Sequence, residues 1–410
     1  MLRNGFSILK MMAASMLLSW GLKATAASTE KVLLNFTGAN GNGPYGALIS
    51  DAAGNLYGTT TGGGAYGLGT VFELVRKAGG GWSQKLLHSF NADGTDGITP
   101  YTKLVFDSAG NLYGTTNNGG PNNVGTIFEL TPSKSVPWKE TILYSFQNNQ
   151  VDGTYPYGNL IFDRSGNLYG TTAGGGSNFN GTAYELIRGK SGQWTESILH
   201  SFNFSDGTNP NAGLLFDVMG NLYGAAYTGG TYGYGTVFKL TPQSTGQWDL
   251  TVLYNFNGQN STGDAPYATL IFDKAGNLYG TTALGGYYDC GMVFELSPQA
   301  SGEWTETIVH SFEPSDWDGG TPYGGLTIDA AGNLYGTTNQ GGRYNYGTVF
   351  ELTPQAGGGW SEKELHVFNN NGKDGYAPYC TLLADKFGHL YGVTYQGGTH
   401  NIGTVFEITH

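Results

Sequence analysis

The chain has 410 residues and a formal net charge of −12, yet only 12% of its residues are charged. It contains 69 glycines, 27 tyrosines and 21 phenylalanines, and after the N-terminus no segment keeps the helical period for any length. This composition is typical of a glycine-punctuated β protein and excludes a disordered or helical chain. The negative charge also argues against binding to a nucleic-acid backbone.

The N-terminus has the pattern of an export signal. Basic residues precede or flank a short apolar run, residues 11–22, and Ala24-Thr-Ala26 offers a small-residue cleavage site. The run is too short to span a bilayer, so we predict a signal peptide over residues 1–26 and a single mature domain over 27–410. Cleavage of this signal peptide would remove Arg3, Lys10 and Lys23 but no acidic residue, so the net charge would fall from −12 to −15. We expect a protein secreted to the extracellular space, the cell surface or the periplasm.

One phrase, Asp-x-x-Gly-Asn-Leu-Tyr-Gly, recurs through the rest of the chain. Its copies start at Asp51, Asp107, Asp163, Asp217, Asp273, Asp329 and Asp385, and only the last replaces its Asn, by His389. The spacings are 56, 56, 54, 56, 56 and 56 residues. Asp bonds readily to the backbone two residues on, and Gly adopts positive φ at no steric cost. Each copy therefore predicts a β-hairpin turn, and an Asp needed seven times shapes a turn rather than catalyses a reaction.

Each repeat holds four predicted strands. In the third repeat they cover Pro156–Phe162, Leu168–Thr172, Gly181–Leu186 and Trp194–Phe202. Four strands in about fifty residues indicate a propeller blade, whereas a β-solenoid coil needs far fewer residues. A lone strand over residues 30–36 matches strand four, and the last repeat ends at strand three, Thr404–Ile408. The sequence thus predicts an all-β, seven-bladed β-propeller with four antiparallel strands per blade, whose last blade is closed by the N-terminal strand.

Other residues recur at fixed places in the repeat. A Trp stands eight residues before the strand-four Phe in six repeats, and we expect these rings to pack beneath or between blades. Histidines recur in strand four (His88, His200, His310 and His366), and we interpret them as structural or surface residues rather than metal ligands. Cys290 and Cys380 lie in non-neighbouring repeats, so a disulfide between them is not expected.

The full repeat phrase resembles a known bacterial family. Gly-Asn-Leu-Tyr-Gly-Thr-Thr, then Gly-Gly, then Gly-Thr-Val-Phe-Glu-Leu-Thr-Pro is similar to the GloVer tandem repeat, named from Gloeobacter and Verrucomicrobia. The resemblance covers residues 30–410 and implies an exported protein, with no established activity or catalytic residue to transfer. The hairpin phrase also resembles that of NHL-type propellers, which supports the fold.

Two loops of each blade are expected on one face: the loop leading into strand one, with Asp-Gly-x-x-Pro-Tyr, and the Gly-Gly-rich loop joining strands two and three. They bring Tyr, Asp, Asn and Gly around the central opening, and Tyr suits sugar rings and peptides. Residues that break the repeat symmetry add further candidates. The predicted ligand-binding residues are Tyr101, Lys103, Tyr157, Asn159, Tyr323, Trp317, Arg343 and Tyr379. No catalytic or metal residue is assigned.

The predicted function is that of a non-catalytic binding or scaffold protein that recognises carbohydrate or another surface polymer through this face. The alternative is a propeller enzyme, a sugar lactonase, lyase or glycan-active hydrolase, with a metal-assisted site at the central channel. A third is a purely structural envelope protein. We expect no cofactor, with calcium as an open alternative, and no nucleic-acid partner, no membrane span and a monomeric state.

Overall fold

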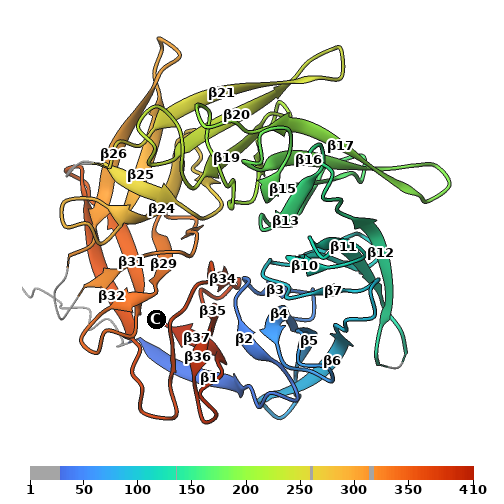
Figure 1. Ribbon diagram of the computed structural model, residues 1–410. Helices are drawn as coiled ribbons and strands as arrows, with labels where there is room; N and C mark the ends of the chain where they lie inside the picture. Colours follow the sequence, from blue (N-terminus) through green and yellow to red (C-terminus); the bar gives the residue numbers. More distant parts are fainter. Residues whose placement is uncertain (1–27, 135, 259–261, 314–317) are drawn as a thin grey trace, which may run out of the picture.

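The computed structural model describes residues 28–134, 136–258, 262–313 and 318–410 (Figure 1). The predicted signal peptide lies outside the described residues. Within them, every regular element is a β-strand, and the strands form a ring of seven antiparallel sheets, so the predicted seven-bladed propeller is confirmed. None of these residues belongs to a helix long and apolar enough to cross a membrane.

Each blade has four strands, ordered from the central axis outward. Blade one comprises β3 (Ile49–Ser50), β4 (Leu56–Gly62), β5 (Thr70–Arg76) and β6 (Trp82–Ser89). Blade two comprises β8 (Val105–Phe106), β9 (Leu112–Thr116), β11 (Thr126–Thr131) and β12 (Lys139–Ser145). Blade three comprises β14 (Ile161–Phe162), β15 (Leu168–Gly175), β16 (Thr182–Arg188) and β17 (Trp194–Ser201). Blade four comprises β18 (Leu215–Phe216), β19 (Leu222–Ala226), β20 (Thr236–Pro242) and β21 (Trp248–Asn255).

The remaining blades follow the same order. Blade five comprises β23 (Ile271–Phe272), β24 (Leu278–Gly285), β25 (Met292–Pro298) and β26 (Trp304–Ser311). Blade six comprises β28 (Thr327–Ile328), β29 (Leu334–Thr338), β31 (Thr348–Pro354) and β32 (Trp360–Val367). Blade seven comprises β34 (Leu383–Ala384), β35 (Leu390–Thr394), β37 (Thr404–Thr409) and β1 (Thr29–Asn35). The N-terminal strand β1 pairs with the C-terminal strand β37, from Thr29 opposite Thr409 to Asn35 opposite Thr404, and closes the ring as predicted.

The innermost strand differs from its prediction, because it is broken. In blade three the expected strand Pro156–Phe162 becomes β13 (Gly153–Pro156) and the two-residue β14, both paired with β15. The residue before the proline, Tyr155, has a φ of 58°, and its counterparts in the other blades also have positive φ. The break itself covers residues 157–160, between β13 and β14. The left-handed Tyr155 lies within β13, where it is the one residue without a partner in β15. Its N–H donates to Val124 O of blade two at 2.8 Å, so the same kink joins neighbouring blades.

Short strands ahead of strand one repeat this arrangement elsewhere. They are β2 (Asn42–Pro44), β7 (Gly97–Ile98), β22 (Gly263–Pro266), β27 (Gly319–Gly320) and β33 (Gly375–Tyr376), with partners that include β10 (Asn118–Gly119), β30 (Gln340–Gly341) and β36 (Gln396–Gly397). Each pairs with the segment that leaves strand two. The pairing places the two expected loops side by side on one face of the ring.

The repeated Asp residues build turns, as the sequence predicts. Asp51 Oδ1 accepts hydrogen bonds from the N–H groups of Ala53 and Asn55, each at 2.9 Å. Its Oδ2 accepts from Asn55 Nδ2 at 2.8 Å and from the Tyr57 hydroxyl at 3.1 Å. The turn glycine, Gly54, has a φ of 81°. Both carboxylate oxygens are therefore used in shaping the hairpin, and the same pattern recurs in the later repeats.

The hydrophobic core lies between blades rather than within them. Phe202, at the end of β17, is fully buried and meets Phe238 of blade four edge to face, with ring centroids 4.9 Å apart. Trp248 of blade four in turn packs near Tyr169 of blade three, at 6.2 Å, so the expected packing of the tryptophans between blades is confirmed. Blade seven has Ser28 where the others have Trp. There the C-terminal His410 ring lies 5.2 Å from Tyr335, the tyrosine that would otherwise meet a Trp.

Candidate functional site

The tyrosines of the Pro-Tyr motif gather at the central opening. Six blades supply one each and blade four supplies Asn211 instead; the set is Tyr45, Tyr101, Tyr157, Tyr267, Tyr323 and Tyr379. Tyr45 stacks on Tyr379 at 4.8 Å, and Tyr101 stacks on Tyr157 at 5.2 Å. The Tyr45 hydroxyl donates across the ring to the Tyr267 hydroxyl at 3.2 Å. Burial raises the pKa of Tyr45 and Tyr157, so these phenols stay protonated and keep their donors.

The tyrosines fill the opening as well as surround it. The cavity that they leave is only about 60 Å³ and is otherwise lined by Asn, Gly, Ala, Thr and the buried Cys380. Ligand sites usually need about 300 Å³ or more. Among the described residues, this lining contains no carboxylate and no imidazole, which are the groups that the channel-enzyme alternative requires.

Asn159 and Lys103 lie one step further along the axis. Asn159 Oδ1 accepts the backbone N–H of Lys103 at 2.9 Å, and its Nδ2 donates across the channel to Thr269 Oγ1 at 3.2 Å. A Cβ added at Gly213 would lie 2.7 Å from Thr269 Oγ1, so blades four and five approach each other closely beside the axis at this level. The Lys103 side chain is solvent-exposed, but the surrounding protein still partly desolvates its ammonium, and this lowers its pKa. Asn159 thus holds three blades together at the axis.

Six aromatic side chains that reach solvent lie on the loops between strands two and three. They belong to the first, third, fourth, fifth and sixth blades, and the exposed fractions run from 50% to 63%: Tyr66, Phe179, Tyr232, Tyr287, Tyr288 and Tyr344. Arg343 lies 5.7 Å above the ring of its neighbour Tyr344. We call these six aromatic residues the rim aromatics. The predicted ligand-binding residues include four Pro-Tyr tyrosines and none of the rim aromatics, because sequence alone does not show which rings pack on one another.

The predicted site residues therefore separate into groups. Tyr101, Tyr157, Tyr323 and Tyr379 line the central opening, and Asn159 joins them. Arg343 lies apart from them, on the loop after β30. Trp317 lies outside the described residues.

A second hollow lies on the opposite face. It encloses about 990 Å³ beside the hairpin turns of blades three, four and five, and Val218 and Met219 are among its exposed residues. Its largest rings, Trp248 and Tyr169, are already packed against each other between blades. This hollow is large enough for a ligand, and its lining includes Arg164 and Lys274.

Groups able to hold a metal occur elsewhere, at the blade junctions. Three sets combine a strand-four His with an Asp and a Glu: His88, Asp96 and Glu140; His310, Asp318 and Glu362; and His366, Asp374 and Glu30. His88 and His366 donate to or accept from the neighbouring Asp, which supports their structural role. Cys290 and Cys380 are free thiols, so the expected absence of a disulfide between them holds.

The repeats of this chain match a known protein family. The model of the Gloeobacter/Verrucomicrobia repeat matches residues 21–184 and 157–406. The chain belongs to the Gloeobacter/Verrucomicrobia repeat family. No curated protein matches this repeat protein in sequence.

Solved structures share the propeller fold with this repeat protein at low identity. The extracellular domain of a protein assigned to the hybrid two-component systems of B. thetaiotaomicron has a TM-score of 0.55 and 12% identity. That match covers 92% of this chain and 39% of the other, so the repeat protein spans about two fifths of that chain. A protein from Bacteroides uniformis, assigned as a 6-phosphogluconolactonase, has a TM-score of 0.49 and 14% identity over 78% of this chain and 83% of its own. At these identities, the first match shows the fold alone.

Proposed function

We propose that this protein is an exported, non-catalytic recognition module that binds carbohydrate or another surface polymer across the loop face of the propeller. The observation that carries the proposal is the set of rim aromatics, which leave half or more of each ring in solvent on the loops of several blades. Flat aromatic rings with polar edges stack on sugar rings and on peptide planes. Loops held on a rigid scaffold are a common place for recognition.

The packing of the central opening favours the rim over the axis. The Pro-Tyr tyrosines pack against one another and leave a cavity of only about 60 Å³. The side chains of the rim aromatics are instead at least half exposed to solvent. The axis therefore acts as the support and the rim as the contact surface. A polymer would cross the face and meet loops of more than one blade.

The test is a binding measurement on a panel of soluble and insoluble polysaccharides, with and without calcium. The variants are Tyr232→Ala and Tyr287→Ala on the rim, and Tyr157→Ala at the opening. Phe387→Ala is the matched control, because Phe387 is 69% exposed on a hairpin turn of the opposite face. Truncating a stacked ring at a binding hot spot costs 1–2 kcal/mol or more, so each rim variant should weaken binding by roughly 5- to 30-fold.

The outcomes separate the candidate surfaces. Loss with the rim variants and none with Phe387→Ala supports the proposal. Loss with Met219→Asp alone would move the ligand to the hollow of the opposite face, where Met219 is 80% exposed. Shortening of any polysaccharide during the same incubation would support the enzyme alternative. No binding to any polysaccharide in the panel would overturn the carbohydrate proposal. Export is tested separately, by finding the protein outside the cytoplasm with its N-terminus near residue 27.

A further inference from the structure

The blade junctions contain a second kind of candidate site. At each junction the residue two before the strand-four Phe meets the residue five before the Pro-Tyr tyrosine and a residue near the start of the next strand four. At two junctions the three residues are His, Asp and Glu with free carboxylate oxygens. We call them the first junction cluster (His88, Asp96 and Glu140) and the closing junction cluster (His366, Asp374 and Glu30).

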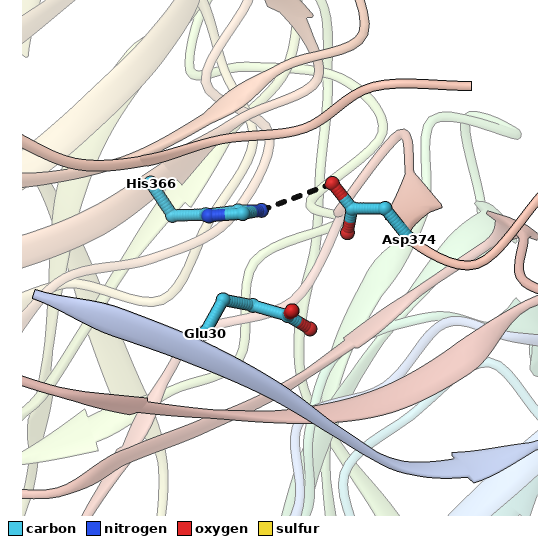
Figure 2. A group of neighbouring side chains, drawn as sticks. All are labelled: Glu30, His366 and Asp374. Carbon is cyan, nitrogen blue, oxygen red and sulfur yellow. Dashed lines mark hydrogen bonds and ion pairs between the residues drawn. The ribbon is translucent and has the colours of Figure 1, made fainter. Parts of the chain in front are cut away.

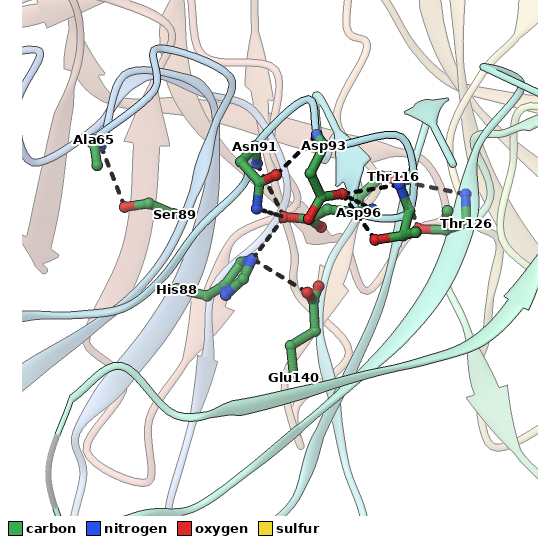
Figure 3. Close-up of polar contacts among 10 residues, drawn as sticks. Ala65, His88, Ser89, Asn91, Asp93, Asp96, Thr116, Thr126 and Glu140 are labelled. Atoms are coloured by element: carbon green, nitrogen blue, oxygen red, sulfur yellow. Dashed lines mark hydrogen bonds and ion pairs between the residues drawn. The ribbon is translucent and has the colours of Figure 1, made fainter. Parts of the chain in front are cut away.

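The first junction cluster joins blades one and two (Figure 3). His88 Nε2 lies 3.3 Å from Asp96 Oδ2 and 3.5 Å from Glu140 Oε2. One potential ligand atom from each residue lies within 4.8 Å of the other two. Asn91 fixes the aspartate from outside, because its backbone N–H and its Nδ2 each donate to Asp96 Oδ2 at 2.9 Å. The cluster is thus held from two blades and the loop that joins them.

The closing junction cluster has the same form and uses the N-terminal strand (Figure 2). His366 Nε2 on β32 lies 3.1 Å from Asp374 Oδ2, and Glu30 of β1 reaches the pair from blade seven. Asn369 again holds the aspartate, with its N–H and Nδ2 at 3.1 and 3.0 Å from Asp374 Oδ2. A ligand bound here would connect β1, which closes the ring, to blade six.

Both clusters leave buried carboxylate oxygens without a partner. The atoms are Asp96 Oδ1 and Glu140 Oε1 in the first, and Asp374 Oδ1 and Glu30 Oε1 in the second. Asp96 is 4% exposed and Asp374 is 6% exposed, and in Figure 2 the free side of the Asp374 carboxylate faces Glu30. Buried polar atoms almost always have a partner, and leaving one unpaired costs about 1–3 kcal/mol. Two facing carboxylates repel each other unless a shared proton or a cation lies between them.

We propose that each of these two clusters binds a divalent transition-metal ion, best matched by Zn²⁺, through one imidazole nitrogen and two carboxylates. Ligand atoms bound to tetrahedral zinc at about 2.0–2.1 Å lie about 3.3 Å apart. In the first cluster both His–carboxylate separations, 3.3 and 3.5 Å, match this spacing. In the closing cluster the His366–Asp374 separation of 3.1 Å matches it, and Glu30 offers a ligand atom within 4.8 Å of the other two. Three protein ligands leave one position for water. The Asn donors supply the outer hydrogen bonds that orient a metal-binding carboxylate.

The other junctions provide natural comparisons. Tyr144 replaces the His at one junction, and its hydroxyl donates to Asp152 Oδ2 at 2.8 Å, so the fold accepts Tyr in place of His. At another junction, Leu250 stands where Glu would be. In the third set, His310, Asp318 and Glu362, the aspartate has no free oxygen, because Asp318 Oδ1 accepts the N–H of Gly319 at 2.7 Å. Asp152 Oδ1 and Glu196 Oε1 are also without a partner at the Tyr144 junction, but no His stands there. The proposal is therefore limited to the two clusters that combine a His with free oxygens on both acids.

The experiment measures Zn²⁺ binding to the full chain, prepared without a polyhistidine tag and stripped with EDTA. Calorimetry and metal analysis by mass spectrometry should give two Zn²⁺ ions per chain in the wild type. His88→Tyr and His366→Tyr reproduce the residue found at the Tyr144 junction, so each should fold and each should lose one ion. Asp152→Asn is the matched control at a junction without His and should keep both ions. Asp96→Asn is a second variant of the first cluster should His88→Tyr fail to fold.

A further readout is specific to the closing junction. Lys31 is exposed in β1, and trypsin cuts it only when the strand leaves its sheet. Zn²⁺ should slow this cleavage at least tenfold in the wild type and leave it unchanged in His366→Tyr. The proposal is overturned by no Zn²⁺ binding to the wild type, or by a stoichiometry that the Tyr variants do not change. Neither result depends on polysaccharide binding, so the two proposals fail separately.

Discussion

The ring is closed by the pairing of β1 with β37, and this gives a sharp test of its energetics. Phe36 follows β1, is fully buried, and meets Phe72 of blade one edge to face at 5.4 Å. Its N–H donates to Gly403 O at 3.1 Å, so it lies where blade seven meets blade one. Phe36→Ala should cost about 3–5 kcal/mol, the usual loss for a buried Phe replaced by Ala. For about 380 folded residues the unfolding entropy is about 0.8 kcal/mol/K, so Tm should fall by roughly 5 °C.

The control is the same substitution in the middle of the chain. Phe202 is equally buried and pairs with Phe238 at 4.9 Å, but its strand β17 follows its sheet neighbour β16 directly along the chain. Phe202→Ala should lower Tm by a similar amount. Only Phe36→Ala should also release β1 locally, and a loss of about 3–5 kcal/mol raises the open population by roughly two to four orders of magnitude.

The assay is limited trypsin digestion at low temperature, following cleavage after Lys31 by mass spectrometry. We expect fast removal of the N-terminal segment in Phe36→Ala, with slow cleavage in Phe202→Ala and in the wild type. Equal acceleration in both variants would refute the reasoning, since it would mean that β1 opens only when the whole ring unfolds.

Two further predictions concern repeat positions. Gly224→Ala should destabilise by about 1–3 kcal/mol, because a Cβ there would lie 2.5 Å from the Phe238 ring; Gly357→Ala, where nothing lies within 4 Å, should be nearly neutral in the same thermal melts. Burial and the charge of Asp152 raise the pKa of Glu196 to about 8, so the folded state favours the protonated acid and stability should fall as pH rises from about 4.5 to 8. Glu196→Gln should flatten this part of the Tm–pH curve, and parallel curves for the two proteins would contradict the assignment.

The fold was predictable because its signals are local and repeated. The Asp-x-x-Gly phrase encodes a turn in its own residues, as the four hydrogen bonds to Asp51 show. Ring closure followed from the phase of the two chain ends. The left-handed residue at Tyr155 was not expected, because a positive φ before proline runs against the usual preference of that position for extended backbone. Its N–H bond to Val124 of the neighbouring blade stabilises it, and one repeat alone does not show that contact.

The candidate site was less predictable, because symmetry conceals which copies of a residue reach solvent. Tyr157 and Tyr232 are both loop tyrosines in sequence, but Tyr157 lines a packed opening and Tyr232 is 59% exposed. Asn159 breaks the repeat pattern, and for that reason the sequence predicts it as a ligand-binding residue. In the structure its side-chain amide forms hydrogen bonds with Lys103 N and Thr269 Oγ1 across the axis. An asymmetric residue on the axis of a ring has a structural use, since seven identical side chains do not fit at one point. Asymmetry therefore points to function more strongly at the rim, where each loop has room of its own.

This distinction also bears on the proposed recognition of a polymer. A ligand on the axis would have to displace stacked tyrosines and the hydrogen bond between Tyr45 and Tyr267. A ligand on the rim displaces only water and meets rings on the loops of several blades. Several weak contacts spread over such a face favour an extended, repetitive partner, because linked contacts strengthen one another without any single deep pocket. The rim thus favours a polymer over a small molecule, and short oligosaccharides should bind it far more weakly than the chains from which they derive.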